Sequence, residues 1–269
     1  MQDNPFGIAP RLWEKIQALR LLDNLLMQTA LDGFIPGAEL ILRIILDMPD
    51  LVITELAVQK LLPNLASRDL VLDVKAVDSE GRHYNVEVQC SDSGTIPRRP
   101  RYHAALMDVE YLRKGHKVSE LPETYVVFIT ENDVLGAGLA VYHIDRVVEE
   151  TGQPFNDGAH IVYANASYVG EDNIGRLMAD FRASDPEEMN YDLLAGQVRA
   201  VKSNRKGVSE MSRVLDEMFQ EGREEERIER LSHLMRRNRW TLDQAMELAG
   251  YPMDQKARYE KLIACRTSG

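Results

Sequence analysis

The stretch LVLDVKAVDSEGRHYNVEVQC, residues 70–90, decides the fold. Apolar and polar residues alternate on both sides of Ser79-Glu80-Gly81, which is the pattern of a β-hairpin. A three-residue loop suits this sequence because Gly81 can adopt the left-handed conformation that closes a bulged turn. In this register Asp78 pairs with Arg82, and the numbers of directly opposed residues add up to 160.

The register predicts a hairpin with one polar face and one apolar face. A two-residue loop would put Asp73 and Glu87 on opposite faces and mix apolar with polar positions, which a half-buried sheet does not tolerate. The three-residue loop is therefore the prediction. It places the pairs Val71/Gln89, Asp73/Glu87, Lys75/Asn85 and Val77/His83 on the polar face, and Leu72/Val88, Val74/Val86 and Ala76/Tyr84 on the apolar face.

Two carboxylates, those of Asp73 and Glu87, are opposed on the polar face, and like charges in this position destabilise a strand pair. Lys75, a raised pKa or a divalent cation could compensate. Together with Gln89, the two acids offer oxygen ligands that suit Mg²⁺. A solvated face on which Lys75 pairs with both acids is the alternative that the hairpin alone leaves open.

Composition narrows the function classes. The chain has 269 residues, 44% hydrophobic content and a net charge of −11, which predicts a substantial core and argues against a broadly nucleic-acid-coating surface. Two cysteines exclude a disulfide framework, and no apolar run reaches membrane-spanning length. Nucleotide-binding, zinc-protease and serine-hydrolase motifs are absent from the sequence. We expect a soluble, cytoplasmic protein that does not bind membranes.

Helices are predicted on both sides of the hairpin. Residues 11–31 and 38–46 have helical spacing, and Glu39 at the start of the second segment is an acid favourable to the helix dipole. A third helix is predicted from Arg101 to Lys114, with one largely apolar stripe marked by Tyr102, Leu106, Val109 and Leu112/Arg113. Basic residues flank it, and they could hold phosphates or serve only solubility: Arg98, Arg99, Arg101, Arg113, Lys114, His116 and Lys117.

The remainder of the chain predicts more strands and then a helical tail. Residues 125–130 form a buried-strand pattern, and residues 139–144 and 160–163 are shorter strand candidates. Thr241 to Gln244 is a capping box for a short helix. We predict an α/β or α+β sandwich around a mixed sheet in residues 1–205 and a charged helical tail in residues 206–269.

These residues resemble the PD-(D/E)XK nuclease superfamily, specifically its nuclease-family transposases, which are related to recombination-promoting nucleases. The resemblance lies in LVLDVKAVD, NVEVQ, IPRRPRYHAALMD, LPETYVVFITENDVLG and the AMELAGYP segment, and it extends from about Asp23 onward. It implies a restriction-endonuclease-like core and a Mg²⁺-dependent DNA endonuclease (Mn²⁺ being the other candidate ion) linked to mobile elements or recombination.

The resemblance also assigns roles to residues. It makes Asp73 and Glu87 metal ligands, with Glu39 completing or orienting the shell. Gln89 stands where many members have a lysine, so Gln89 or Lys75 is expected to position water or phosphate. DNA contacts are implied for Arg98, Arg99, Arg101 and Tyr102.

Two alternatives accompany this expectation. A nuclease-like fold could bind nucleic acid or protein without cleaving it, which the net charge and the missing lysine favour. The substrate could also be RNA. A homodimer is one arrangement that would supply the two sites needed to cut both strands.

Overall fold

The fold is that of a computed structural model that describes residues 4–62, 70–90, 96–113 and 115–267. The chain forms two compact units, Met1–Met211 and Ser212–Gly269. The division falls within the helix α7 (Arg205–Asn238), and the boundary predicted at residue 206 lies in the same helix. We describe each unit separately.

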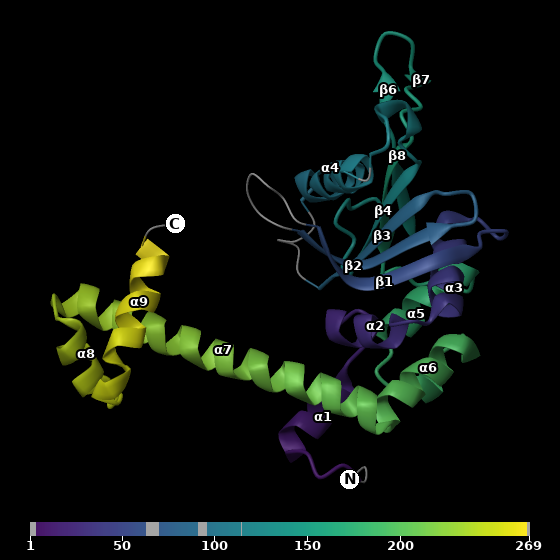
Figure 1. The fold of residues 1–269 in the computed structure, drawn as a ribbon. Coiled ribbons are helices and arrows are strands. Elements are labelled where there is room, and N and C mark those ends of the chain that lie inside the picture. Colours follow the sequence, from purple (N-terminus) through teal and green to yellow (C-terminus); the bar gives the residue numbers. More distant parts are fainter. Residues whose placement is uncertain (1–3, 63–69, 91–95, 114, 268–269) are drawn as a thin grey trace. The chain divides into compact units, whose positions relative to one another are not determined.

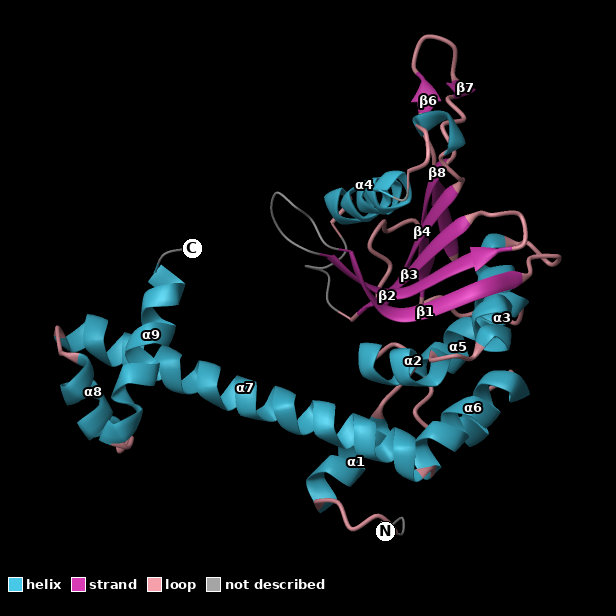
Figure 2. Ribbon diagram, in the orientation of Figure 1, coloured by secondary structure: helices cyan, strands magenta, loops and turns pink. Residues whose placement is uncertain are grey.

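The first unit is built on a six-stranded sheet with the order β1-β2-β3-β4-β8-β5 (Figure 2). Neighbours β1, β2 and β3 are antiparallel, β3, β4 and β8 are parallel, and β5 is antiparallel to β8, so the predicted mixed sheet is confirmed. A separate pair, β6 (Val147–Val148) and β7 (Gln153–Pro154), forms a small two-stranded sheet. The strands of the main sheet are β1 (Ile53–Leu62), β2 (Leu70–Asp78), β3 (His83–Gln89), β4 (Thr124–Thr130), β5 (Val141–Ile144) and β8 (Ala159–Asn165).

The β2–β3 hairpin has the register that the sequence predicts. Four pairs from Val74/Val86 to Val77/His83 obey it, and Gly81 has a φ of 80°. The turn is held by the buried carboxylate of Asp78, which accepts hydrogen bonds from the Arg82 backbone N–H (2.8 Å) and the Tyr84 hydroxyl (2.8 Å). The Tyr84 hydroxyl, which is the polar group on the apolar face, thus has its hydrogen-bond partner within the hairpin.

Helices cover both faces of the sheet (Figure 1). On one side α4 (Arg98–Arg113) packs its apolar residues against β4 and β8, forming a cluster of Ala104, Leu106, Met107, Val126, Phe128 and Tyr163. The other side carries α2 (Asn24–Leu31), α3 (Ile35–Leu46), α5 (Asn173–Arg182) and α6 (Asp192–Ser203). The structure therefore has the helix-flanked α/β architecture of a restriction-endonuclease-like fold.

The prediction of one continuous helix over residues 11–31 is wrong. The segment forms α1 (Pro10–Ala18) and α2, separated by a turn in which the Asp23 N–H donates to the Arg20 carbonyl (2.8 Å). The buried ammonium of Lys202, from α6, donates to the carbonyl oxygens of Gln17 (2.8 Å) and Leu19 (2.6 Å), where α1 ends. A partner 183 residues away in sequence thus satisfies carbonyls that would otherwise continue the helix.

The predicted apolar stripe of α4 is also wrong in part. Leu106 is buried, but Tyr102 and Val109 are 36% and 41% exposed. Lys114, the predicted end of this helix, lies outside the described residues.

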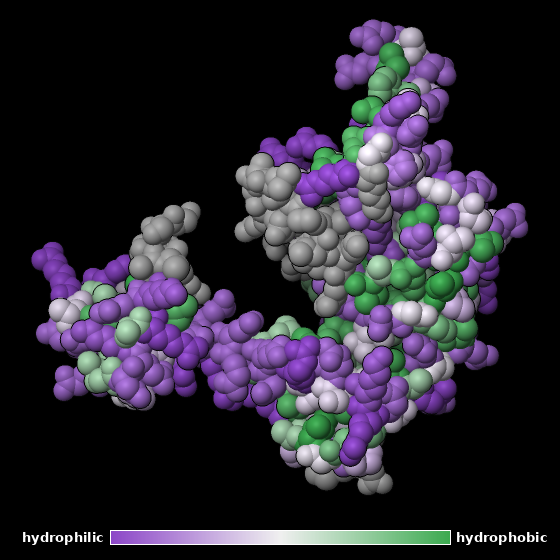
Figure 3. Space-filling model, in the orientation of Figure 1, coloured by the Kyte–Doolittle hydropathy of each residue, from purple (hydrophilic) through white to green (hydrophobic). Residues whose placement is uncertain are grey.

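The second unit is helical and has its own small core. The C-terminal part of α7 packs with α8 (Leu242–Ala249) and α9 (Lys256–Thr267). The predicted capping box is confirmed: the Gln244 N–H donates to Thr241 Oγ1 (3.4 Å) and the Thr241 N–H donates to Gln244 Oε1 (3.0 Å). Hydrophilic residues cover most of the face of this unit seen in Figure 3. Its core residues are Ile228, Leu231, Leu242, Ala245, Met246 and Tyr259.

Throughout the described ranges, no helix combines the length and the apolar character needed to cross a membrane.

Candidate functional site

The polar face of the β2–β3 hairpin is buried. All five of its central polar side chains are less than 10% exposed, and Asn85 and Glu87 are 0% and 1% exposed. The sequence left open the alternative that this face is exposed to solvent. The burial of these side chains contradicts that alternative. These five residues are Asp73, Lys75, Asn85, Glu87 and Gln89.

Asp73 and Glu87 meet just beyond the last described ladder pair between β2 and β3, Val74/Val86. The backbone N–H of Asp73 donates to Glu87 Oε1 (3.1 Å), and the N–H of Val88 donates to Asp73 Oδ2 (3.4 Å). Side-chain carboxylates thus take two backbone donors at the point where the ladder stops, and those donors hold the two acids next to each other.

Burial and mutual repulsion hold protons on this pair. Desolvation, followed by the charge of Asp73, raises the pKa of Glu87 to about 8. Desolvation also raises the pKa of Asp73, against hydrogen bonds from neighbouring donors that lower it. The pair therefore keeps a proton near neutral pH, and a cation bound between the two carboxylates would replace it.

Helix α4 presents polar side chains to this face. Arg99 donates to Gln89 Oε1 (3.1 Å) and lies 3.7 Å from Glu87 Oε2. Glu110 lies near the other end of the helix, and its Oε2 accepts a hydrogen bond from Lys75 Nζ (2.5 Å). Lys75 therefore pairs with α4 and not with Asp73 or Glu87, the pairing considered from the sequence.

His103 is a site residue that the sequence analysis missed. It is fully buried, and its Nδ1 lies 2.9 Å from Asn85 Oδ1 and 3.5 Å from Glu87 Oε1. Burial and the charge of Arg99 lower the pKa of His103 to about 4, so the ring is neutral. Its position four residues after Arg99, on the same helix face, is the signal that could have found it.

Helix α2 supplies two further missed residues. Gln28 Nε2 donates to Asp73 Oδ1 (3.0 Å). The Asn24 amide, in the orientation that satisfies both of its ends, donates to Asp73 Oδ2 (3.3 Å) and to the Val88 carbonyl (3.1 Å). Their spacing of four residues again marks one helix face, but no local pattern indicates that this face meets Asp73.

Glu39 is not joined to the two acids by any hydrogen bond or ion pair among the described residues. Its carboxylate binds Arg43 of the same helix at 2.6 Å, and Arg43 also donates to the Leu51 carbonyl (2.7 Å). A metal-binding role for Glu39 stays a prediction, and it would require the Arg43 ion pair to open.

The basic residues at the start of α4 divide into two sets. Arg99 is turned toward the carboxylates, whereas Arg98, Arg101 and Tyr102 are exposed. The first turn of α4 thus places three exposed side chains next to one that reaches the buried acids.

The donor set suits a hard divalent cation. Within the described ranges, no group of three or more His, Cys, Asp or Glu residues is arranged to hold a metal ion. Two adjacent carboxylates nevertheless match Mg²⁺, which commonly takes one or two carboxylates and keeps several waters. The raised pKa of both acids indicates a site whose negative charge lacks full compensation within the protein.

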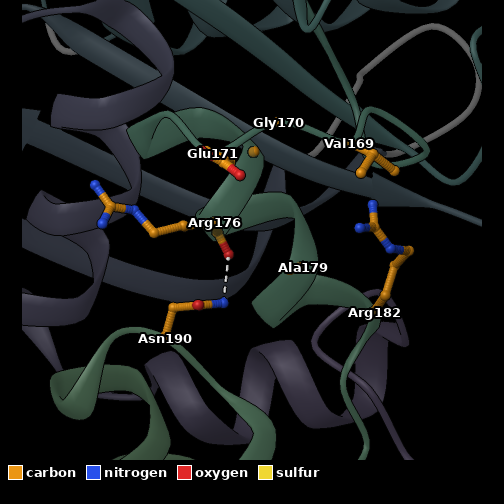
Figure 4. A pocket seen from close by; sticks show the side chains of 8 residues that line it. Val169, Gly170, Glu171, Arg176, Ala179, Arg182 and Asn190 are labelled. Atoms are coloured by element: carbon orange, nitrogen blue, oxygen red, sulfur yellow. Dashed lines mark hydrogen bonds between the residues drawn. The ribbon is translucent and has the colours of Figure 1, made fainter.

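A separate cavity of about 480 Å³ lies beside α5 and has a different character (Figure 4). Two arginines line it, but Arg182 donates to the carbonyl oxygens of Ala166 and Tyr168, and the Arg176 carbonyl accepts from Asn190 Nδ2 (3.3 Å). Glu171 is its one acidic lining residue. Among its described lining residues the cavity offers no paired carboxylates, so we do not consider it as a metal site.

One family of known proteins matches the part of the chain that contains the β2–β3 hairpin. Residues 50–173 match the model of a family described as "PD-(D/E)XK nuclease family transposase". This range is narrower than the resemblance seen in the sequence, and it contains all strands of the main sheet, the paired acids and α4. No curated protein and no solved structure gives a significant match to the chain. The stretch that builds the sheet and contains the acid pair, residues 50–173, is thus similar to the PD-(D/E)XK nuclease family transposases.

Proposed function

We propose that this protein is a Mg²⁺-dependent DNA endonuclease that acts in mobile-element or recombination processes. The observation that carries the proposal is the buried Asp73–Glu87 pair: the Asp73 N–H donates to Glu87 Oε1, and both carboxylates have raised pKa values. The match of residues 50–173 to the family model supports nuclease chemistry and the link to mobile elements. The ion and the DNA substrate are our inference.

Asp73 and Glu87 would hold the cation. When bound, a divalent ion supplies Lewis-acid polarisation of the phosphodiester and lowers the pKa of a coordinated water. Gln28 and the Asp73 and Val88 backbone N–H groups keep the two carboxylates in place. Mn²⁺ has the same preference for oxygen ligands and is the alternative ion.

Gln89 and Lys75 are the candidates for positioning water or phosphate. Gln89 Oε1 already accepts from Arg99, which leaves the amide nitrogen of Gln89 as a donor. Lys75 would have to leave Glu110 before its ammonium could reach a phosphate. Opening of that ion pair on DNA binding is therefore part of the proposed role of Lys75.

The first turn of α4 would contact the DNA backbone. Arg98, Arg101 and Tyr102 are exposed there, and Arg99 extends the same basic surface to the acids. Arginine forks bind phosphate oxygens in bidentate fashion, so this surface would orient the strand without reading its sequence. The first unit has a net charge of −11 over residues 1–211, so affinity would depend on this local surface and fall steeply with salt.

Nicking of supercoiled plasmid in Mg²⁺ tests the proposal. Wild type should nick DNA, and Asp73→Ala should lose this activity because one of two carboxylate ligands is removed. Glu55→Ala is the matched control, since Glu55 is an exposed acid on the neighbouring strand β1. Retained nicking by a folded, contaminant-free Asp73→Ala protein would contradict the assignment. The same assay with RNA decides whether DNA or RNA is the substrate.

A binding module without cleavage is the second candidate. Gln89 and Lys75 are the two candidates for the role of the lysine that many family members have. The observation that favours a binding module is that both are already bound within the protein, Lys75 to Glu110 and Gln89 to Arg99. Electrophoretic-mobility and nicking assays on one preparation separate the two candidates. Retention of DNA with no cleavage in Mg²⁺ or Mn²⁺ would select the module. Sedimentation of the free and DNA-bound protein would test the proposed homodimer.

A further inference from the structure

The two oxygens of the Glu87 carboxylate have different surroundings. Oε1 accepts two hydrogen bonds, from the Asp73 N–H (3.1 Å) and from Asn85 Nδ2 (2.8 Å). Oε2 lies 3.7 Å from Arg99, beyond hydrogen-bond distance. Oε1 is therefore held by neutral donors, whereas Oε2 faces the charged groups Arg99 and Asp73.

The Asn85 amide that binds Oε1 is itself held in one orientation. Asn85 is fully buried, and its Nδ2 also points to the Val74 carbonyl (3.4 Å). Its Oδ1 consequently faces His103 Nδ1 at 2.9 Å. An amide oxygen can only accept, so Nδ1 of His103 carries the proton and donates it.

The His103 ring is anchored by packing. It meets Phe128 edge-on, with the ring centroids 5.5 Å apart. Among the described residues, His103 Nε2 has no hydrogen-bond partner. The hydrogen bond to Asn85 is thus the directional polar contact of His103. A buried imidazole with one unpaired nitrogen reduces the stability of the fold, so a purely structural role does not explain a histidine at this position.

We propose that His103 and Asn85 are positioning residues that act in series on Glu87: His103 fixes the Asn85 amide, and Asn85 holds Oε1 so that Oε2 is presented to the cation. This inference rests on the proposed function, because it specifies how the proposed cation site is oriented. It assigns a role to a histidine and an asparagine that do not themselves contact the ion. Outer partners of this kind change metal affinity by about 10- to 100-fold when removed.

Substitutions at His103 can separate the hydrogen bond from the packing. His103→Leu removes the Nδ1 donor and keeps an apolar side chain against Phe128. His103→Asn keeps a donor at the position of Nδ1, because the asparagine amide nitrogen superimposes on that atom. Met107→Ala is the control, since Met107 is buried on the same helix and belongs to the apolar cluster on β4.

Calorimetric titration of the full chain with Mn²⁺ and metal-free crystal structures provide two independent measurements. The dissociation constant for Mn²⁺ should rise about 10- to 100-fold in His103→Leu, recover in His103→Asn and stay unchanged in Met107→Ala. The crystal structure of His103→Leu should show the Asn85 amide turned and Glu87 reoriented. Asn85→Ala should give the same loss as His103→Leu, and the double variant should lose no more affinity than either single variant. Where His103→Leu fails to fold, the affinity and the crystal structure of Asn85→Ala carry the test.

The result that overturns the inference is a Glu87 carboxylate with unchanged orientation in His103→Leu or Asn85→Ala. Additive losses of Mn²⁺ affinity from the two positions would do the same, because residues acting in series cannot add. Failure of wild type to bind Mn²⁺ would instead refute the proposed function. In that case the Glu87 orientation in the crystal structures still decides whether the two residues position it.

Discussion

The two faces of the β2–β3 hairpin are both buried, but burial has opposite consequences on them. The apolar face carries Val74, Ala76 and Val86, and removing these side chains from water stabilises the fold. The polar face carries charged groups whose desolvation is unfavourable, and each needs a partner from α2 or α4. The comparison indicates that burial of the apolar face stabilises the fold, whereas burial of the charged groups on the polar face reduces its stability.

The largest loss of stability is expected on the apolar face. Val86→Ala removes two buried methyl groups and leaves a cavity, so the free energy of unfolding should fall by about 2 kcal/mol. Urea unfolding measures this loss. The Mn²⁺ dissociation constant of the variant should equal that of wild type under conditions where both are folded. A weakened cation affinity would show that the two faces are not independent.

A change of comparable size and opposite sign is expected on the polar face. Glu87→Gln removes a buried charge beside Asp73 and should raise the free energy of unfolding of the metal-free protein by about 1–3 kcal/mol at pH 8. Cleavage should be lost in the same variant. Equal or lower stability than wild type at pH 8 would contradict the view that this face is destabilising.

The pH dependence of that difference has a definite sign. The pKa of Glu87 is raised from 4.5 to about 8 on folding, so the folded state binds the proton more tightly than the unfolded state. The stability contributed by the protonated acid is fully present below about pH 4.5 and is lost as the pH rises through 8. Wild type and Glu87→Gln should therefore have similar stability at pH 5 and diverge toward pH 8. Unfolding in EDTA at several pH values measures the divergence, and parallel profiles would exclude the raised pKa.

The sequence predicted the hairpin and its two faces because both depend on local rules. Period-two alternation and the φ of Gly81 determine the register, which four ladder pairs confirm. The same rules put Asp73 and Glu87 on one face. Their partners come from α2 and α4, and no local signal in the sequence indicates those contacts.

The position of α4 could not be derived from its apolar pattern. Helices normally bury apolar residues, and this rule selected Tyr102 and Val109, which are exposed. The face turned to the hairpin instead carries Arg99, His103 and Glu110, because the surface beneath it is polar. The orientation of α4 thus combines these polar contacts with the packing of Ala104, Leu106 and Met107 against β4 and β8, and no single pattern in the sequence reveals it.

The central claim is that the Asp73–Glu87 pair binds a divalent cation. Its most direct test is a calorimetric titration of the metal-free protein with Mg²⁺ or Mn²⁺ at pH 8. If the Asp73–Glu87 pair is a cation site, wild type should bind the ion and release a proton, and affinity should decline as the pH falls below 8. Glu87→Gln should lose this binding, while Glu55→Ala should retain it. Binding that is the same in wild type and Glu87→Gln, or absent from a folded wild type, would contradict the claim.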